Sequence, residues 1–387
     1  MRPYSRVYAT VNLDAVASNM RSMRDNLPAS TLIMGSVKAD GYGHGSVPVA
    51  KTIEPYVFGY AVATIDEGII LRRHGINKTI LILGVTHESR YEDLLRYDIR
   101  TAMFQYEKAK KLSDLALKQG KKAVVHLALD TGMSRIGMKA DREHAKEAAA
   151  IAALEGIEVE GLFTHFARAD ETDKSAYEEQ YRRYKEFLGY LEELGVKIPI
   201  RHCSNSAGII ESLESNHMDM VRAGIAIYGM YPSDEVDHNS VKLTPAMEIK
   251  SCITYIKEIE AGTAVSYGGT FVADHTMKVA TIPVGYGDGY VRSLSGKGDV
   301  LIHGKRAAIL GRICMDQFMV DVTEIPEAKF MDPVTLVGKD KDAVIRVEDL
   351  SDLSGRFNYE FVCDLSKRVP REYYKNGTIV KQIDYFE

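Results

Sequence analysis

The sequence lacks the features that mark several large classes of protein. No apolar run reaches the roughly 18 residues that a membrane-spanning helix needs, and the N-terminal segment has no continuous apolar stretch typical of a signal peptide. The formal net charge is −5, so there is no overall basic field that could recruit nucleic acid. These absences predict a cytoplasmic protein without a membrane or nucleic-acid partner.

Cysteine is scarce as well. The four cysteines (Cys203, Cys252, Cys314 and Cys363) are far apart and show no C-x-x-C spacing. Neither a structural zinc site nor a disulfide framework is indicated, so no metal is expected and buried free thiols are the simplest interpretation. What is present is an ordinary globular composition, with 45% hydrophobic and 27% charged residues. A length of 387 residues predicts two domains, or one large domain with an appendage.

The first part of the chain alternates short apolar segments with longer amphipathic ones. The apolar segments have the hydrophobic or β-branched character of strands that are buried on both faces. They cover residues 31–37, 57–63, 79–83, 101–104, 123–129, 159–165, 200–203 and 220–222. Eight such strands with helices between most of them predict a closed (β/α)8 barrel, and an open doubly wound sheet is the alternative.

The character of the sequence changes near residue 230. Residues 231–240 (YPSDEVDHNS) are polar and rich in turn-forming residues, which predicts a linker. Short, often alternating apolar segments follow and predict strands within residues 246–259, 277–282, 300–302, 306–309, 317–322 and 333–337. We therefore expect a cofactor-binding barrel domain over residues 1–235 and a mostly-β domain over residues 236–387.

Polar side chains lie where several of the predicted barrel strands end. Lys38 follows the first strand, His165 ends the sixth, Asn205 and Ser206 follow the seventh, and Arg222 ends the eighth. Barrel enzymes place their chemistry at the carboxyl ends of the strands. A lysine in such a low-dielectric mouth has a lowered pKa and a nucleophilic amine, although many lysines at strand ends simply reach solvent.

One of these positions lies in the segment VKADGYGHG, residues 37–45, which resembles the cofactor-lysine motif of the alanine racemase family. The resemblance continues in order through DTGMSRIG at 130–137, THFA at 164–167, NSA at 205–207, VRAGI at 221–225, VSYG at 265–268, GYGDG at 285–289, GRICMDQ at 311–317 and NYE at 358–360. One such match would be weak, but this many in order across both predicted domains are highly specific.

The family implies a (β/α)8 barrel followed by a β domain, assembled as a head-to-tail homodimer. It also implies pyridoxal 5'-phosphate as cofactor, and interconversion of L-alanine and D-alanine, which supplies D-alanine for peptidoglycan. Lys38 matches the lysine that holds the cofactor covalently and then exchanges a proton with the substrate α-carbon. Tyr267 matches the second base, which the family places in the barrel of the other subunit. Racemisation needs a proton donor or acceptor on each face of a planar carbanion, and these two residues would supply them.

The tyrosine can act as a base near neutral pH only if positive neighbours lower its pKa well below about 10. In the family, a histidine matching His165 contacts this tyrosine and is linked to the arginine matching Arg222. That arginine faces the pyridine nitrogen of the cofactor. A guanidinium donates a hydrogen bond and keeps its proton, so it disfavours a protonated ring and should suppress transamination. From the residues alone, a salt bridge inside the barrel mouth explains Arg222 equally well.

The remaining matches imply contacts to the cofactor phosphate and to the substrate. Tyr42 and Ser206 match hydroxyl groups on the phosphate, although Ser206 taken alone is explained as the N-cap of a helix over residues 206–213. The full set of implied cofactor residues is Lys38, Tyr42, His165, Asn205, Ser206, Arg222, Gly224, Ile225 and Tyr359. Arg135 and the Met315 backbone N–H would receive the substrate carboxylate. Tyr359 would narrow the pocket, and Tyr286 and Arg292 would line the route to it, which favours alanine over larger substrates but discriminates less against serine.

The sequence departs from the family at Ala128, where many members carry a lysine modified to a carbamate that holds the substrate-binding arginine. No carbamate forms on alanine. We therefore expect Arg135 to be held by chloride, water or another side chain in a gap with a polar lining, and His126 lies on the same strand face.

Three alternatives remain beside an alanine racemase. A decarboxylase of similar architecture would need a catalytic cysteine in the second domain, but Cys314 lies in a segment that matches the racemases. A non-enzymatic cofactor-binding barrel would lack the second domain and Tyr267. A serine or broad-specificity amino-acid racemase of the same fold is the most serious alternative.

Overall fold

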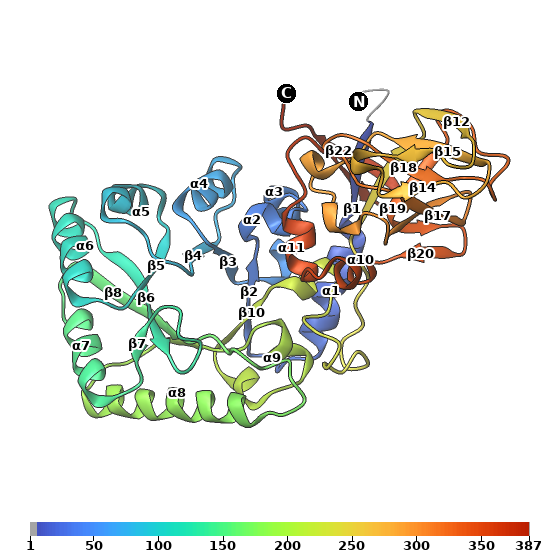
Figure 1. Ribbon diagram of the computed structural model, residues 1–387. Helices are drawn as coiled ribbons and strands as arrows, with labels where there is room; N and C mark the ends of the chain where they lie inside the picture. Colours follow the sequence, from blue (N-terminus) through green and yellow to red (C-terminus); the bar gives the residue numbers. More distant parts are fainter. Residues whose placement is uncertain (1–5, 387) are drawn as a thin grey trace. The chain divides into compact units, whose positions relative to one another are not determined.

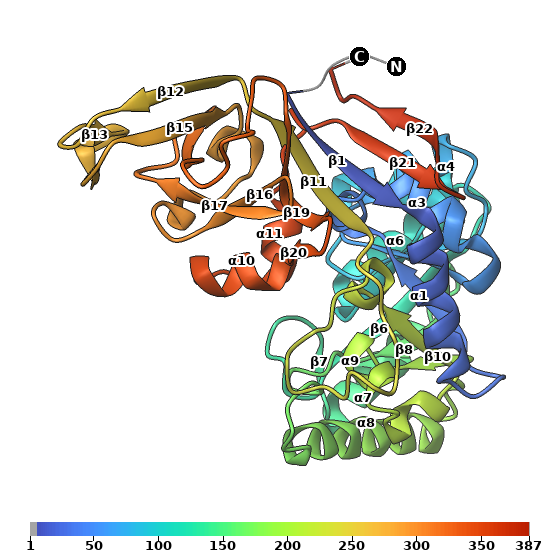
Figure 2. The ribbon, with the colours of Figure 1, turned by 90° about the vertical axis from the view of Figure 1, so that its right-hand side faces the viewer.

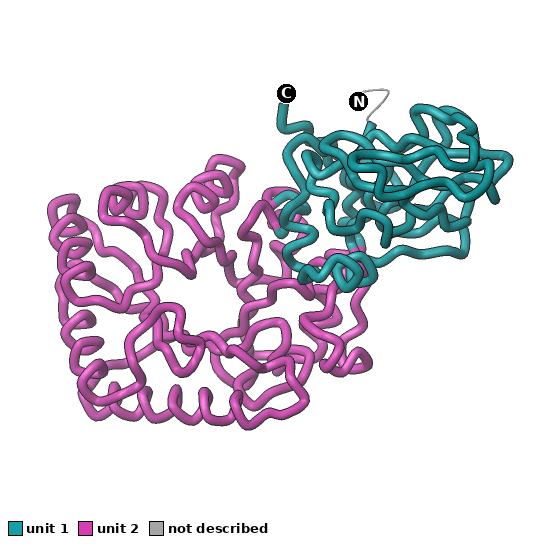
Figure 3. The backbone as a smooth tube through the Cα atoms, viewed as in Figure 1, with its two compact units in different colours: residues 1–14, 42–45, 246–387 teal, residues 15–41, 46–245 magenta. Residues whose placement is uncertain are grey.

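The structure is a computed structural model that describes residues 6–386. The chain divides into two compact units (Figure 3). Residues 15–41 and 46–245 form the barrel unit, and the described residues up to Asp14, residues 42–45 and those from Ala246 onward form the β unit. The sequence did not indicate that β1 (Val7–Asn12) would belong to the second unit. The division into functional domains at residues 235 and 236 stays a prediction.

The barrel unit contains all eight strands that the sequence predicted, and each pairs in parallel with its neighbours. The strands are β2 (Leu32–Ser36), β3 (Gly59–Val62), β4 (Thr79–Ile82), β5 (Arg100–Met103), β6 (Ala123–Asp130), β8 (Ile157–Phe163), β9 (Ile200–His202) and β10 (Met220–Ala223). Pairing of β5 with β6 and of β10 with β2 closes the ring. The predicted closed barrel is confirmed and the open sheet is excluded. Met34, Ala61, Leu81 and Met220 are fully buried together in one cluster of its core.

Helices lie outside the barrel strands (Figure 1). They are α1 (Leu13–Asp25), α3 (Ser46–Ile53), α4 (Ile65–Arg73), α5 (Tyr91–Tyr97), α6 (Tyr106–Lys118), α7 (Arg142–Ala152), α8 (Ser175–Glu193) and α9 (Ser206–Ile210), with a turn α2 (Lys38–Tyr42) after β2 and a short β7 (Met138–Lys139) beside β6. On α8, Tyr177, Tyr181 and Tyr184 are buried because their spacing places them on one face of the helix. Across residues 6–386, every helix is too short or too polar to traverse a lipid bilayer.

The described part of the β unit is built on one eleven-stranded sheet. Its strands are β1, β11 (Met247–Cys252), β12 (Tyr255–Ile259), β15 (Met277–Ile282), β16 (Asp299–Ile302), β17 (Lys305–Leu310), β18 (Phe318–Asp321), β19 (Pro333–Asp340), β20 (Ala343–Ile345), β21 (Arg371–Lys375) and β22 (Thr378–Ile383). In Figure 2, β1 runs between β11, its antiparallel neighbour, and β21, its parallel neighbour. A small hairpin, β13 (Ala264–Val265) and β14 (Phe271–Val272), and two helices, α10 (Val347–Ser354) and α11 (Asn358–Cys363), complete the unit. The predicted mostly-β domain is confirmed.

Candidate active site

One cavity of the barrel unit lies at the carboxyl ends of its strands. Four residues that the sequence singled out line it: Lys38, Arg135, His165 and Arg222. The rest of its lining is apolar and consists of Leu83, Leu129, Met133, Ile136 and Phe163. Cationic groups in an otherwise apolar wall suit an anionic ligand with an apolar body. The predicted location of the chemistry, at the strand ends, agrees with the position of this cavity.

Lys38 begins a turn of left-handed backbone. Ala39 and Asp40 both have φ 50° and ψ 49°, and Gly41 has φ 62°. A left-handed conformation costs a non-glycine residue about 1–2 kcal/mol, so the surroundings must hold this turn in place. Asp40 contributes directly, because its Oδ1 accepts a hydrogen bond of 2.8 Å from the Ser46 N–H.

Glu67, on the first turn of α4, holds the same turn from outside. Its Oε1 accepts a hydrogen bond of 2.7 Å from the Ala39 N–H. Its Oε2 accepts from the N–H groups of Ala63 at 2.7 Å and Thr64 at 3.3 Å. Thr64 and Glu67 also form the capping box of α4. Sequence reasoning missed Glu67, although TIDE at residues 64–67 directly follows a predicted strand and has the capping-box spacing.

Arg222 lies on β10 with its guanidinium inside the barrel, and it is only 4% exposed. Nη1 donates to Nδ1 of His202 at 2.8 Å and to the His202 carbonyl at 3.0 Å. Nη2 donates to the carbonyls of Thr164 at 2.6 Å and Cys203 at 2.9 Å. Nε–H has no acceptor within residues 6–386, and no carboxylate there pairs with Arg222, so the salt-bridge explanation is not supported. Burial lowers the pKa of Arg222 to about 10, which leaves it charged at neutral pH.

His165 follows β8 and lies beside this arginine. Its Nδ1 is 3.4 Å from Nη2 of Arg222. Burial, followed by the charges of Arg222, Arg135 and Lys38, lowers the pKa of His165 to about 3. The ring is therefore neutral at physiological pH, and its position between three cations leaves Nδ1 as an acceptor.

Asn205 and Ser206 organise the loop after β9. Asn205 is the N-cap of α9, because its side chain accepts a hydrogen bond of 3.1 Å from the Gly208 N–H. Ser206 is not the N-cap, and the expected helix over 206–213 is shorter, ending at Ile210. Instead, Ser206 Oγ accepts from the N–H groups of Gly224 at 2.9 Å and Ala226 at 3.3 Å.

Ile225, which lies between those two residues, is fully buried and begins the 3-10 helix η4 (Ile225–Tyr228). Within residues 6–386, its backbone N–H has no acceptor. Gly224 and Ile225 are both among the implied cofactor residues; the Gly224 N–H already donates to Ser206 Oγ, and the Ile225 N–H remains available to a ligand.

The surroundings of Ala128 differ from the polar gap that was expected. Ala128 is 1% exposed and packs in an apolar cluster with Ala102 and Phe163. Both ring nitrogens of His126 are already used, Nδ1 by His202 and Nε2 by Glu160, so His126 is not the partner of Arg135. Among residues 6–386, the polar lining expected beside Ala128 is not found, and the anion or water expected to hold Arg135 stays a prediction. Arg135 itself is exposed and forms no ion pair with any residue in the described part of the chain.

In the β unit, three loops bring Tyr267, Met315 and Tyr286 close together. Tyr267 begins η5 (Tyr267–Gly269), and the adjacent Ser266 donates from Oγ to the Arg312 carbonyl at 2.5 Å. Tyr286 begins η6 (Tyr286–Asp288), where the N–H groups of Tyr286 and Gly287 donate to the carbonyls of Cys314 at 3.1 Å and Met315 at 2.9 Å. The side chains of Tyr267, Tyr286 and Met315 are exposed, as is Arg292 on η7 (Arg292–Leu294).

Asp288 anchors the Tyr286 loop, and sequence reasoning missed it. Its carboxylate is 1% exposed and pairs with both Arg6 and Arg368. One of its oxygens also accepts a hydrogen bond of 3.0 Å from the Gly285 N–H. An aspartate inside the glycine-rich segment GYGDG at residues 285–289 was the available signal.

Tyr42 and Tyr359 also belong to the β unit and lie close together. Their ring centroids are 6.0 Å apart at an angle of 54°. Tyr359 stacks on Phe357 with centroids 4.4 Å apart, which fixes the plane of its ring. Tyr42 is buried and Tyr359 is partly buried.

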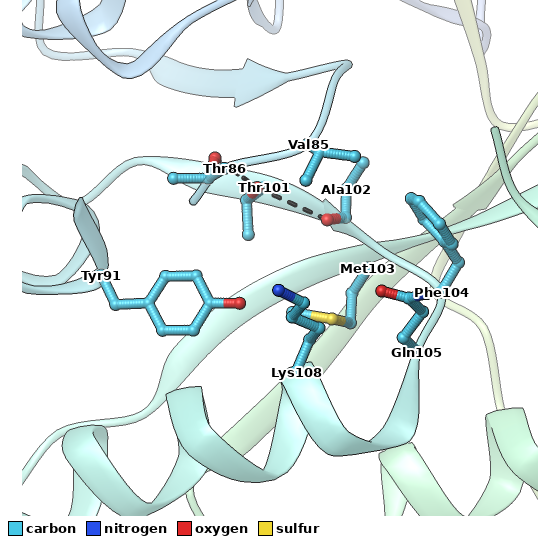
Figure 4. Close-up of a pocket in the computed structure, with 9 residues that line it drawn as sticks. All are labelled: Val85, Thr86, Tyr91, Thr101, Ala102, Met103, Phe104, Gln105 and Lys108. Atoms are coloured by element: carbon cyan, nitrogen blue, oxygen red, sulfur yellow. Dashed lines mark hydrogen bonds between the residues drawn. The ribbon is translucent and has the colours of Figure 1, made fainter. Parts of the chain in front are cut away.

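A second cavity in the barrel unit contains none of the predicted residues (Figure 4). Thr86 and Thr101, which line it, bond to each other through their hydroxyls at 2.9 Å. Its lysine, Lys108, is paired with Glu88 at 2.9 Å. Its tyrosine, Tyr91, stays protonated because burial raises its pKa to about 12. This cavity therefore offers no group suited to acid–base or covalent chemistry, and the cavity with Lys38 is the better candidate.

Two family models match this chain. Residues 11–232 match the model described as alanine racemase, N-terminal domain, and residues 246–373 match alanine racemase, C-terminal domain. An alanine racemase from Desulforamulus reducens is 45% identical over 368 residues, which cover 95% of this chain and 98% of that protein. Among solved structures, an alanine racemase from Clostridium difficile 630 has a TM-score of 0.96 at 40% identity, with all of both chains covered. The alanine racemase of Bacillus anthracis with bound L-Ala-P has a TM-score of 0.94 at 34% identity and covers 100% of this chain and 99% of that one.

Proposed function

This chain belongs to the alanine racemase family and is an isomerase that interconverts L-alanine and D-alanine, and we propose that Lys38 and Tyr267 carry out its two proton transfers. The observation that carries this proposal is the cavity that Lys38 shares with Arg135, His165 and Arg222 at the strand ends. Supplying D-alanine for peptidoglycan is the known role of the family. A cytoplasmic location stays a prediction from the sequence.

The residues of the barrel mouth fit pyridoxal 5'-phosphate, the cofactor that family membership implies. The Nε–H of Arg222 and the backbone N–H of Ile225 are donors without an acceptor in residues 6–386, and a ring nitrogen and a phosphate are acceptors of the required kinds. When bound, this cofactor stabilises the negative charge that develops at the substrate α-carbon. Lys38 would hold it covalently, and Ser206 with Ile225 would bind its phosphate.

Each proposed base has a distinct task. Lys38 would take or give a proton at the α-carbon on one face of the substrate, and the Tyr267 hydroxyl would do so on the other face. Arg135 and the Met315 N–H would hold the substrate carboxylate, so that the α-hydrogen lies between the two bases. Tyr359 would limit the size of the substrate side chain, with Tyr286 and Arg292 on the route to the site.

Exposure in the β unit supports a site that is shared in a homodimer. Tyr267 is 69% exposed, Met315 is 52% exposed and Tyr286 is 43% exposed. Large apolar side chains that gather on an exposed surface mark an interaction site. A second copy of this chain would cover that surface, so that Tyr267 of one copy reaches the barrel of the other copy. This arrangement agrees with the head-to-tail dimer of the family.

A first experiment tests Lys38 and the substrate together. The purified protein should racemise alanine faster than serine or lysine. Borohydride reduction of the protein as isolated, followed by peptide mapping, should fix the cofactor on Lys38. A label on another lysine would contradict the proposal for Lys38, and a faster reaction with serine would correct the substrate.

A second experiment tests the shared site. Lys38→Ala and Tyr267→Phe chains should each be inactive, and a mixture should regain activity because one site of the heterodimer has both bases. Random pairing of two chains gives about one quarter of the wild-type activity. Lys38→Ala mixed with the double variant Lys38→Ala and Tyr267→Phe is the control and should stay inactive. Failure of the first mixture to regain activity in exchanged dimers would place both bases in one chain.

A further inference from the structure

Two fully buried histidines inside the barrel are not used by the proposed reaction. His126 on β6 and His202 on β9 are both 0% exposed. His126 Nδ1 lies 2.8 Å from His202 Nε2, and His126 Nε2 lies 2.9 Å from Oε2 of Glu160. At the other end, Nδ1 of His202 receives the 2.8 Å hydrogen bond from Nη1 of Arg222. The four side chains therefore form an unbroken chain from Glu160 on β8 to the arginine at the barrel mouth.

Two local features of the barrel, a β-bulge and a glycine, make this series of hydrogen bonds possible. The register between β6 and β8 shifts after the pair Val125 and Val159, and the next pair is His126 and Gly161, which leaves Glu160 as the extra residue of a β-bulge. A Cβ atom at Gly161 would overlap the His126 ring, so only glycine leaves space for it. At the far end, Nε of Arg100 lies 3.4 Å from Oε2 of Glu160.

The bonds in this chain have only one consistent direction. Arg222 is always a donor, so Nδ1 of His202 must be unprotonated. A neutral His202 then carries its proton on Nε2 and donates it to Nδ1 of His126, which must be unprotonated in turn. His126 therefore carries its proton on Nε2 and donates it to the Glu160 carboxylate, which can only accept.

Burial is a second reason for both rings to be neutral, separate from the direction of the hydrogen bonds. Burial, followed by the charge of Arg222 and then by His126, lowers the pKa of His202. Burial also lowers the pKa of His126, an effect that outweighs the opposing hydrogen bond and charge of Glu160 and is reinforced by Arg100 and Arg222. A doubly protonated His202 would turn an N–H toward the arginine, and two donors would face each other.

We propose that Glu160, acting through His126 and His202, is a positioning residue for Arg222, which it holds with its Nε–H free to bind the ligand. Because its tautomer is fixed, Nδ1 of His202 accepts one hydrogen of Nη1. Three backbone carbonyls accept the other hydrogen of Nη1 and both hydrogens of Nη2. Only Nε–H is left without an acceptor in residues 6–386. This inference rests on the proposed role of Arg222, and its first test needs neither substrate nor turnover.

The direct test is nitrogen-15 NMR of histidine side chains in the full-length protein. Variants His126→Gln and His202→Gln identify the two signals by their loss. The proposal expects both rings to be neutral, with Nδ1 unprotonated and Nε2 protonated, between pH 6 and pH 8. Either ring in the other tautomer, or doubly protonated, would overturn it whatever the enzyme activity.

Two substitutions at one position separate positioning from simple packing. Glu160→Gln keeps an acceptor for His126, so both tautomers and kcat should stay close to wild type. Glu160→Leu removes the acceptor, so both tautomers of His126 should appear and kcat should fall about 10-fold, with a change in KM for alanine below about two-fold. The matched control is Glu158→Leu, an exposed glutamate of the same strand.

The outcomes are distinct. If Glu160→Leu retains a single tautomer and wild-type kcat, or if Glu160→Gln and Glu160→Leu lose the same activity, the positioning role is wrong. If the tautomers respond as expected but racemisation does not, the hydrogen-bonded side chains only stabilise the barrel interior. The proposed role of Arg222 in the reaction is then wrong.

Discussion

The turn that carries Lys38 should depend on a single carboxylate, that of Glu67. Replacing Glu67 with alanine removes the acceptor of three backbone N–H groups, those of Ala39, Ala63 and Thr64. The first of them belongs to the residue directly after Lys38. We therefore expect Glu67→Ala to lower both the stability of the protein and its kcat, although Glu67 does not line the cavity.

The magnitude follows from two opposing quantities. Ala39 and Asp40 are both left-handed, which costs about 1–2 kcal/mol each and about 2–4 kcal/mol together. Hydrogen bonds to a charged acceptor contribute about 1.5–3 kcal/mol each when buried, and less here because Glu67 is half-buried and water replaces part of its effect. We expect Glu67→Ala to reduce the free energy of unfolding by about 2 kcal/mol, which corresponds to a fall in Tm of about 2–3 °C for a chain of 387 residues. With the strain no longer balanced, the turn should leave its observed conformation and kcat should fall about 10-fold or more.

The assay pairs urea unfolding with steady-state racemisation in both directions. Asp66→Ala is the control, because it removes a more exposed carboxylate from the same turn of α4, one that forms an ion pair with Arg90 at 2.7 Å. That variant should change stability by less than about 1 kcal/mol and leave kcat unaltered. If Glu67→Ala loses stability but keeps wild-type kcat and KM, the hydrogen bond to Ala39 does not hold Lys38 in place and the reasoning is refuted.

Three further predictions concern other buried groups. Ser206→Ala should weaken binding of the cofactor and lower the free energy of unfolding by about 2 kcal/mol, because it leaves the N–H groups of Gly224 and Ala226 without an acceptor; unchanged values in cofactor titration and urea unfolding would contradict this. Asp288→Asn should cost about 3 kcal/mol in the same unfolding assay, since it leaves two arginines facing a neutral amide; a loss below about 1 kcal/mol would show that the pairs contribute little. His165, whose pKa burial lowers to about 3, stays neutral in the folded protein while the unfolded chain takes up a proton below about pH 6.5. Stability should therefore decrease as the pH falls from about 6.5 toward 3, and His165→Asn should reduce that slope in unfolding curves at several pH values.

The barrel could be predicted from the sequence because its strands have a local signature. Segments such as 79–83 and 123–129 are almost entirely apolar or β-branched, since strands of a closed parallel barrel are buried on both faces; the exception in the second segment is His126. Closure itself could not be predicted in this way. It depends on β5 pairing with β6, and a run of apolar residues gives no information about its partner across the sheet. The assignment of β1 to the β unit escaped prediction for the same reason.

The site shows the same limit at finer scale. Lys38, His165 and Arg222 could be predicted because each follows or ends a strand, and the barrel brings such ends together. The environment of Ala128 could not, because the loss of a long side chain says nothing about what fills its space, and here Ala102 and Phe163 close it with apolar atoms.

His126 shows why the least predictable contacts are those between strands. In the sequence it lies two residues before Ala128, on the strand face where a partner for Arg135 is expected. In the structure, a one-residue shift of register on the neighbouring strand places Glu160 beside its Nε2 and Gly161 beside its ring. Such a bulge adds one residue to one strand and leaves the hydrophobic pattern of both strands almost unchanged, so no periodicity reports it. The register shift between β6 and β8 therefore creates the contact of His126 with Glu160, and the sequence pattern does not reveal it. Strand register thus decides which groups hold Arg222, whereas the positions of strand ends decide which residues line the cavity.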